Sequence, residues 1–332
     1  MRLDNHAVSA DTHAIYRYNN VDPTQSTNLR RSFRNEIHRK LDEVIDDVQE
    51  WFDDENEDEF DTSRLRYRFE EWFEQKLFNE VLGSVRDSEL HNGDHWTGSH
   101  VRTAYQHGLS MAKDDLQQFG KTEYERKKAV KFYSDAHKKA VEMEYEAAYM
   151  GLRDQMHRLV DDMGEVIRAG IDGGYSVDMF ANEATALIDS QAKNHATAHA
   201  NTIVVDAINE ALLVSYEKAG ITEVGVAPES HGDGTTQNAV AVPFTRIRQN
   251  VDDPETFAEA VGIDTDEAES LPDPDDPTTP DDVQWVTAGD SNVCTACASL
   301  EGTILAIEDV RGHEQFQPPI HPNCRCRLLP LA

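Results

Sequence analysis

Apolar residues recur at intervals of three and four positions through most of the chain before Gly220, and this spacing constrains the fold more than any other feature. Such intervals place the residues on one face of an α-helix. A first series begins after Leu29 and a second ends near Gly83, and we expect these two helices to pair as an antiparallel hairpin. The first series comprises Phe33, Ile37, Leu41, Val44, Val48 and Phe52, and the second comprises Leu65, Phe69, Trp72, Phe73, Leu77, Val81 and Leu82.

Further amphipathic series predict that helices continue as far as residue 219. One long helix is predicted over residues 123–168, with Ala129, Phe132, Tyr133, Ala136, Ala140, Met143, Ala147, Met150, Met156, Leu159, Met163 and Ile167 on its apolar side. Ser176 has the residue type of an N-cap for the next helix. A last helix is predicted over residues 193–218, and Gly220 suits the position just after its end. The sequence therefore predicts a mainly α fold with an elongated helical domain.

The pattern changes after Gly220. Residues 221–226 and 239–244 predict short strands, and another is predicted at 283–286. The proline-rich, acidic segment 245–282 predicts a loop or a partly disordered insert, because it has little apolar surface to bury. Four parts are expected: an N-terminal arm with the helical hairpin (1–94), a helical domain (95–222), short strands with the acidic insert (223–284), and a small α+β C-terminal module (285–332).

The charge balance is strongly acidic, with 63 acidic against 31 basic residues and a formal net charge of −32. The acidic residues are spread over nearly every segment, and only 11 of the basic residues are lysine. This pattern indicates adaptation to molar salt, where a Debye length of roughly 3 Å screens self-repulsion. The charge therefore reports on the solvent rather than on a partner. We also expect no signal peptide and no membrane-spanning segment, because no apolar run approaches the required length.

All four cysteines lie at the C-terminal end, as Cys294-Thr-Ala-Cys297 and His321-Pro-Asn-Cys324-Arg-Cys326. Two thiolates in a C-x-x-C turn can face one ion, and a second cluster can complete a tetrahedron. We expect one structural Zn²⁺ held by the four cysteines, with His321 as a competing ligand or a supporting donor. A Cys₃His set with Cys326 spare is the close rival. Disulfides between the two pairs are the main alternative, and a thioredoxin-like role lacks the surrounding βαβ pattern.

A basic stretch from Lys121 to Lys139 stands out in this acidic chain, and we expect its contact residues to be Arg126, Lys127, Lys128 and Lys131. Lysines and arginines on a solvated helix face are the simplest explanation. The functional alternative is a docking face for an acidic partner or for nucleic-acid phosphate. Within that alternative, Arg126 is favoured over its lysine neighbours, because short-range pairs survive salt better.

The cysteine-rich string resembles the phage head-morphogenesis family, whose members are minor capsid proteins similar to protein F of phage Mu. Trp285–Cys297, Leu300–Gly302 and Pro318–Cys326 carry this resemblance most specifically. Upstream, three helical stretches are also similar to the family: Trp96–Leu116, His137–Gly174 and Ala200–Gly220. Residues 1–90 match no part of the family that we can place, and residues 227–282 interrupt the join between helices and cysteines.

The resemblance implies a structural role without catalysis. Such proteins join the procapsid in few copies, bind the portal protein from inside and act in head assembly or genome delivery. The segment 95–222 would then bind the portal, with the major capsid protein and packaged DNA as further candidate partners. The expected location is the virion interior near the portal vertex, and the host cytoplasm during assembly. Together with the acidic composition, this points to a tailed virus or provirus of a haloarchaeon.

Two other functions are compatible with parts of the sequence. A zinc-ribbon nucleic-acid-binding protein would use Arg325 and Arg327 beside the cysteines, together with the basic stretch. A zinc enzyme would need an open coordination position, whereas this string offers more ligands than one ion takes. The chain also lacks the H-E-x-x-H, P-loop and nucleophile-elbow motifs. We therefore expect a protein that is not an enzyme.

Overall fold

The computed structural model of the chain describes residues 24–54, 62–118, 120–221, 223–227, 242–243, 284–285, 304–312, 317–320, 324 and 326–330. Contacts divide these residues into two compact units. The helical unit contains the described residues of Ser26–Glu223 and Ala306–Cys324, together with Pro330. The sheet unit contains the described residues of Val224–Leu305 and Arg325–Leu329, together with Thr24 and Gln25. Most of the described residues are helical, which confirms the predicted mainly α class.

The sheet unit is built from short strands. Three of them form one sheet in the order β4-β1-β5, and β2 pairs with β3 in an antiparallel ladder that aligns Val242 with Trp285. These strands confirm, in shortened form, the strands expected near residues 221–226, 239–244 and 283–286. Their bounds are β1 Glu223–Ala227, β2 Val242–Pro243, β3 Gln284–Trp285, β4 Ile304–Ala306 and β5 Arg327–Pro330.

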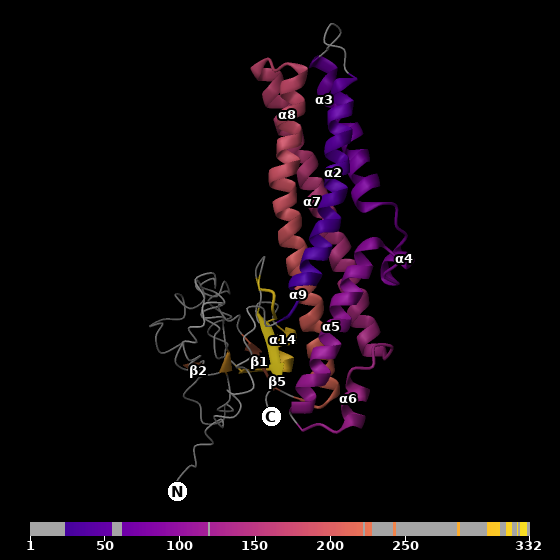
Figure 1. Cartoon of the computed structure of the whole chain (residues 1–332), viewed down its shortest axis with the longest axis vertical. Helices are drawn as coiled ribbons and strands as arrows, with labels where there is room; N and C mark the ends of the chain where they lie inside the picture. The colour runs from indigo at the N-terminus through magenta and orange to yellow at the C-terminus, as the bar shows by residue number, and fades with distance from the viewer. Residues whose placement is uncertain are drawn as a thin grey trace. The chain divides into compact units, whose positions relative to one another are not determined.

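The helical unit begins with the predicted hairpin (Figure 1). Helix α2 spans Thr27–Asp53 and buries the six apolar residues of the first series. Helix α3 spans Thr62–Lys76 and continues into the π-helical turn η2, Leu77–Leu82. Trp51 of α2 packs edge-on against Phe69 of α3, and Lys76 donates to Asp47 at 2.9 Å, so the two helices run antiparallel.

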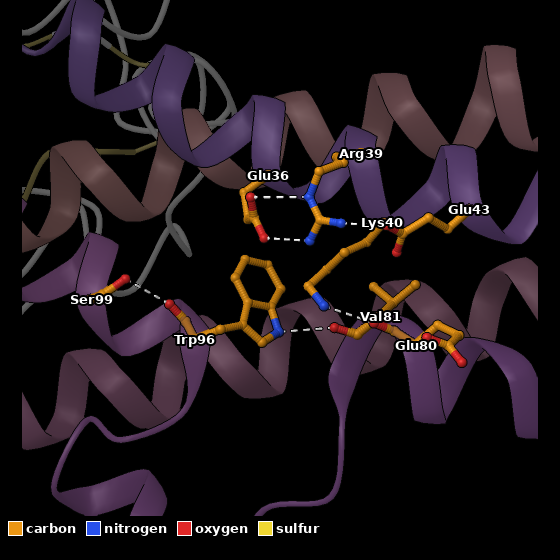
Figure 2. A network of polar contacts seen from close by, with 8 residues as sticks. All are labelled: Glu36, Arg39, Lys40, Glu43, Glu80, Val81, Trp96 and Ser99. Carbon is orange, nitrogen blue, oxygen red and sulfur yellow. Dashed lines mark hydrogen bonds and ion pairs between the residues drawn. The ribbon is translucent and has the colours of Figure 1, made fainter.

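Lys40 and Trp96 fasten the end of η2 to its neighbours (Figure 2). The Lys40 ammonium donates to the Glu80 carbonyl at 2.8 Å and lies 5.2 Å from the centre of the Trp96 ring. The Trp96 indole N–H donates to the Val81 carbonyl at 2.9 Å. These bonds satisfy carbonyl groups that the end of a helix leaves without intrahelical donors. A residue from α2 and one from α5 therefore hold the same helix end.

Helix α5, Trp96–Gln118, follows the short helix α4, Asp87–His91. It packs closely on α9, Lys193–Lys218. Gly108 makes this approach possible, because a Cβ atom at that position would lie 2.5 Å from the carbonyl oxygen of Ile208. The absence of a side chain thus brings the two helix backbones into direct contact.

The prediction of one long helix over residues 123–168 is wrong in its first third. The structure instead has α6, Glu123–Ala129, then a break, and then α7, Asp135–Gly173. The Thr122 hydroxyl accepts from the Glu125 amide at 3.3 Å, and the Glu125 carboxylate accepts from the Thr122 amide at 2.8 Å, so a capping box starts α6. The break shifts the buried face at the start of α7. Met143 and Tyr133, expected on the apolar side, are exposed.

The last two predicted helices form one continuous helical rod. Helix α8, Val177–Leu187, passes through the π-helical turn η3, Ile188–Ala192, into α9, Lys193–Lys218. Ser176 is the N-cap as predicted, since its hydroxyl accepts from the Met179 amide at 3.4 Å. Gly220 follows the helix end with a φ of 72°, which confirms its expected role. Helix α9 contacts α2, α5 and α7 and is buried on nearly all sides between Ile203 and Tyr216.

The remaining helix of this unit is α14, Ile307–Gly312, which comes late in the chain. It buries Ile307 and Val310. Across the described residues, no helix is both long enough and apolar enough to cross a membrane.

Candidate functional site

The cysteine cluster lies largely outside the described residues. Cys294, Cys297 and His321 are not among them, whereas Cys324 and Cys326 are buried thiols with 1% and 6% exposure. Within the described ranges, no group of three or more His, Cys, Asp or Glu is placed to hold a metal ion. Cys324 and Cys326 have one residue between them. Two buried thiols in this arrangement are suitable donors for zinc, since thiolates are preferred ligands of this ion. The full ligand set therefore stays a prediction.

The basic stretch covers α6, the break after it and the start of α7, and α6 packs on α5 and α9. Lys127 and Lys128 of α6 and Lys131 of the following turn are all exposed. Lys127 pairs with Glu123 at 2.6 Å, but both side chains are about two-thirds exposed, so this pair adds little. We call these three lysines, together with the exposed Tyr124 and Tyr133, the basic tip.

Arg126 differs from the lysines around it. Its side chain is half-buried, and its Nε atom is buried with no hydrogen-bond partner among the described residues. The sequence favours Arg126 as the contact for an acidic partner or for phosphate, but only part of its side chain is available at the surface. The exposed members of the basic tip are lysines and tyrosines. Tyrosine is enriched at protein–protein interfaces, so the exposed Tyr124 and Tyr133 are a feature typical of a contact surface.

His137 fixes α6 against the rest of the helical unit. The ring is fully buried at the start of α7, and its Nε2 lies 2.6 Å from the carbonyl of Ala129, the last residue of α6. A carbonyl only accepts, so Nε2 carries the proton and donates, and Nδ1 then accepts from the Tyr105 hydroxyl at 2.9 Å. Burial lowers the pKa of His137, which keeps the ring neutral as this arrangement requires. The basic tip is therefore positioned by buried hydrogen bonds to α5 and α7.

Sequence reasoning missed a group of buried carboxylates between α7 and α9. Glu144 and Glu210 are each only 8% exposed, and Arg311 of α14 pairs with Glu210 and Glu217. Glu144 is not among the residues that the sequence analysis expected on the buried side of the long helix. The start of α7 at Asp135 turns Glu144 inward, and Ser134, a residue type favoured at N-caps, is the sequence signal for that start.

Comparison with known proteins supports the C-terminal resemblance. Residues 273–329 match the family described as Phage Mu protein F like protein. This range contains all four cysteines as well as α14, and it does not reach the helices before residue 223, so the upstream resemblance stays a prediction. No curated protein and no solved structure matches the chain. The match suggests a phage head-morphogenesis or capsid-related role, and it is a match to a family of structural head proteins.

Proposed function

We propose that this chain is a structural minor capsid protein of a tailed virus, which binds the portal protein inside the immature head and acts in head assembly or genome delivery. The observation that carries the role is the family match over residues 273–329. We place the protein in the virion near the portal vertex, with association in the host cytoplasm during assembly. The major capsid protein and packaged DNA are further candidate partners.

The basic tip is our candidate portal contact. Residues 121–139 contain seven basic and three acidic residues, whereas the whole chain carries a formal charge of −32. An acidic partner would meet repulsion over most of this chain's surface and attraction at the tip. Complementary charge of this kind sets orientation and register between partners. The exposed Tyr124 and Tyr133 add apolar contact area to the same surface.

Co-purification with the portal protein of the same virus tests the contact. Lys127, Lys128 and Lys131 would be changed together to glutamate, and we expect portal binding to weaken at least about tenfold, since like charges would then face each other. The matched control changes the exposed Arg31, Arg66 and Arg86 to glutamate, which alters net charge equally elsewhere on the helical unit. Arg126→Lys is examined separately, because the burial of Arg126 links it to stability.

The results separate two claims. Equal binding by the tip variant and the wild-type chain would reject the basic tip as the contact. No association between the portal and the wild-type chain would reject the portal as partner. Arg327, expected as a phosphate contact in the zinc-ribbon alternative, is 9% exposed, which weighs against that function.

We also propose one structural Zn²⁺ held by Cys294, Cys297, Cys324 and Cys326, with His321 as the rival ligand. When bound, the ion would cross-link two distant parts of the chain's C-terminal end. A small module with few large apolar side chains gains much of its stability from such a bond. The burial of Cys324 and Cys326 supports this role, because a structural zinc site is closed to solvent.

A further inference from the structure

A single arginine fastens α14 to the long helices of the helical unit. The Arg311 Nε donates to Glu217 Oε1 at 3.0 Å, and its Nη2 donates to Glu217 Oε2 at 3.3 Å. Its Nη1 donates to Glu210, which also accepts from Gln317 at 3.3 Å. The guanidinium thus bridges two carboxylates that lie seven residues, or about two turns, apart on α9. A forked pair of the kind that it forms with Glu217 is strong and directional.

Arg311 meets an excess of negative charge. Glu210 and Glu217 are joined by Glu144 of α7, whose Oε2 is buried and has no hydrogen-bond partner among the described residues. Asp206 of α9 also acts on Glu144 electrostatically. Burial, with the charges of Asp206 and Glu210, raises the pKa of Glu144, whereas Arg311 lowers it. Within this group of carboxylates, the bonds of Arg311 go to Glu210 and Glu217.

The docked segment has little other support. Helix α14 has only 6 residues, and a helix so short does not persist alone in water. Apart from its ion pairs, it is held by the burial of Ile307 and Val310. In the sequence, this segment lies between β4 and β5 and within the range matched by the family.

We propose that Arg311 with Glu210 and Glu217 forms a releasable latch, which holds α14 on α9 and, when opened, exposes Ile307, Val310 and the two carboxylates. One guanidinium controls the release, because no second cation among the described residues bonds to either carboxylate. Opening leaves Glu210 and Glu217 without that countercharge, so a cationic side chain of a partner could take the vacated place. The device needs no portal contact and stands apart from the proposed function.

Hydrogen exchange of the full-length chain, followed by mass spectrometry, tests the latch. In Arg311→Gln, the amides of Ile307–Gly312 should exchange at least about tenfold faster, while peptides from α5, α7 and α9 keep their wild-type rates. Arg168→Gln is the matched control, because Arg168 pairs with Glu165 on an exposed part of α7.

The carboxylate side is tested by removing its charge. The double variant Glu210→Gln with Glu217→Gln should reproduce the Arg311→Gln rates, and the triple variant should show no further increase. Glu144→Gln should leave α14 exchange at or below the wild-type rate, since the bonds of Arg311 go to Glu210 and Glu217. Wild-type exchange of α14 in Arg311→Gln would overturn the latch. An equal acceleration of all helices would also overturn it, because general unfolding would then explain the effect.

Discussion

At the scale of single residues, His199 predicts how stability depends on pH. Its ring is buried between α7 and α9, and its Nε2 lies 3.0 Å from the carbonyl of Ala148. Burial lowers the pKa of His199 to about 4. The His199 imidazole therefore binds a proton near pH 6.5 in the unfolded chain, but only near pH 4 in the folded chain. Stability should fall by roughly 3 kcal/mol as pH drops through this window.

Urea unfolding at pH 7 and pH 4.5 measures this effect. The difference between the wild-type chain and His199→Gln isolates the contribution of one ring from other titrating groups. We expect the variant to be less stable at pH 7 and to lose less stability on acidification. Parallel pH profiles for the two proteins would contradict the assignment.

The sequence pattern also predicts the wrong buried face for part of one helix. Tyr133 and Met143 were expected on an apolar face but are 74% and 61% exposed, whereas Glu144 is buried. Farther along the same helix, Met156 and Ile167 are buried as predicted. A break of five residues after α6 rotates the buried face of the helix that follows. A single amphipathic pattern that is continued across the break does not include this rotation. A buried carboxylate such as Glu144 is invisible to a method that places apolar residues inside.

At the scale of elements, the closest helix packing gives a stability prediction. Gly108→Ala should improve the intrinsic helix propensity of α5 by about 1 kcal/mol. The added Cβ would, however, lie 2.5 Å from the Ile208 carbonyl oxygen and 2.8 Å from the Ala211 Cβ. Overpacking against a backbone atom should outweigh the gain and destabilise the protein by about 1–3 kcal/mol.

Chemical denaturation of Gly108→Ala beside Gln106→Ala checks this prediction. Gln106 is exposed on the same helix, so its replacement should change stability by less than about 0.5 kcal/mol. A Gly108→Ala protein as stable as the wild type would show that α5 and α9 can separate slightly at no cost.

Elements with a clean apolar period were predictable, and their junctions were not. Helix α2 buries the same six residues that its sequence spacing identified. The junction between α8 and α9 was expected as a gap, yet the π-helical turn η3 carries the chain through it. A π-helical turn adds a residue to the local repeat, so it shifts the apolar face and imitates the end of one helix and the start of another. Tertiary packing against α2 decides between these outcomes.

At the scale of the whole molecule, the two units should respond differently to loss of metal. If zinc joins the four cysteines, a chelator should reduce the stability of the C-terminal end and leave most helical signal intact, because the helices have their own core. Metal analysis of protein purified without chelator should give about one zinc per chain. Absence of zinc, or four thiols that react at once under native conditions, would contradict the site. The ligand set, the four proposed domain boundaries and the haloarchaeal origin all stay predictions.

Helix α7 also fixes a length within the helical unit. Its 39 residues correspond to about 58 Å at 1.5 Å per residue, roughly twice the width of a small domain. The basic tip directly precedes its first turn, and Gly174 ends it with a left-handed backbone. A partner bound to α6 would therefore lie far from the turn at Gly174–Ser176. That distant turn is a natural attachment point for a fluorescent protein, which could report the position of this chain in a head without touching the bound end.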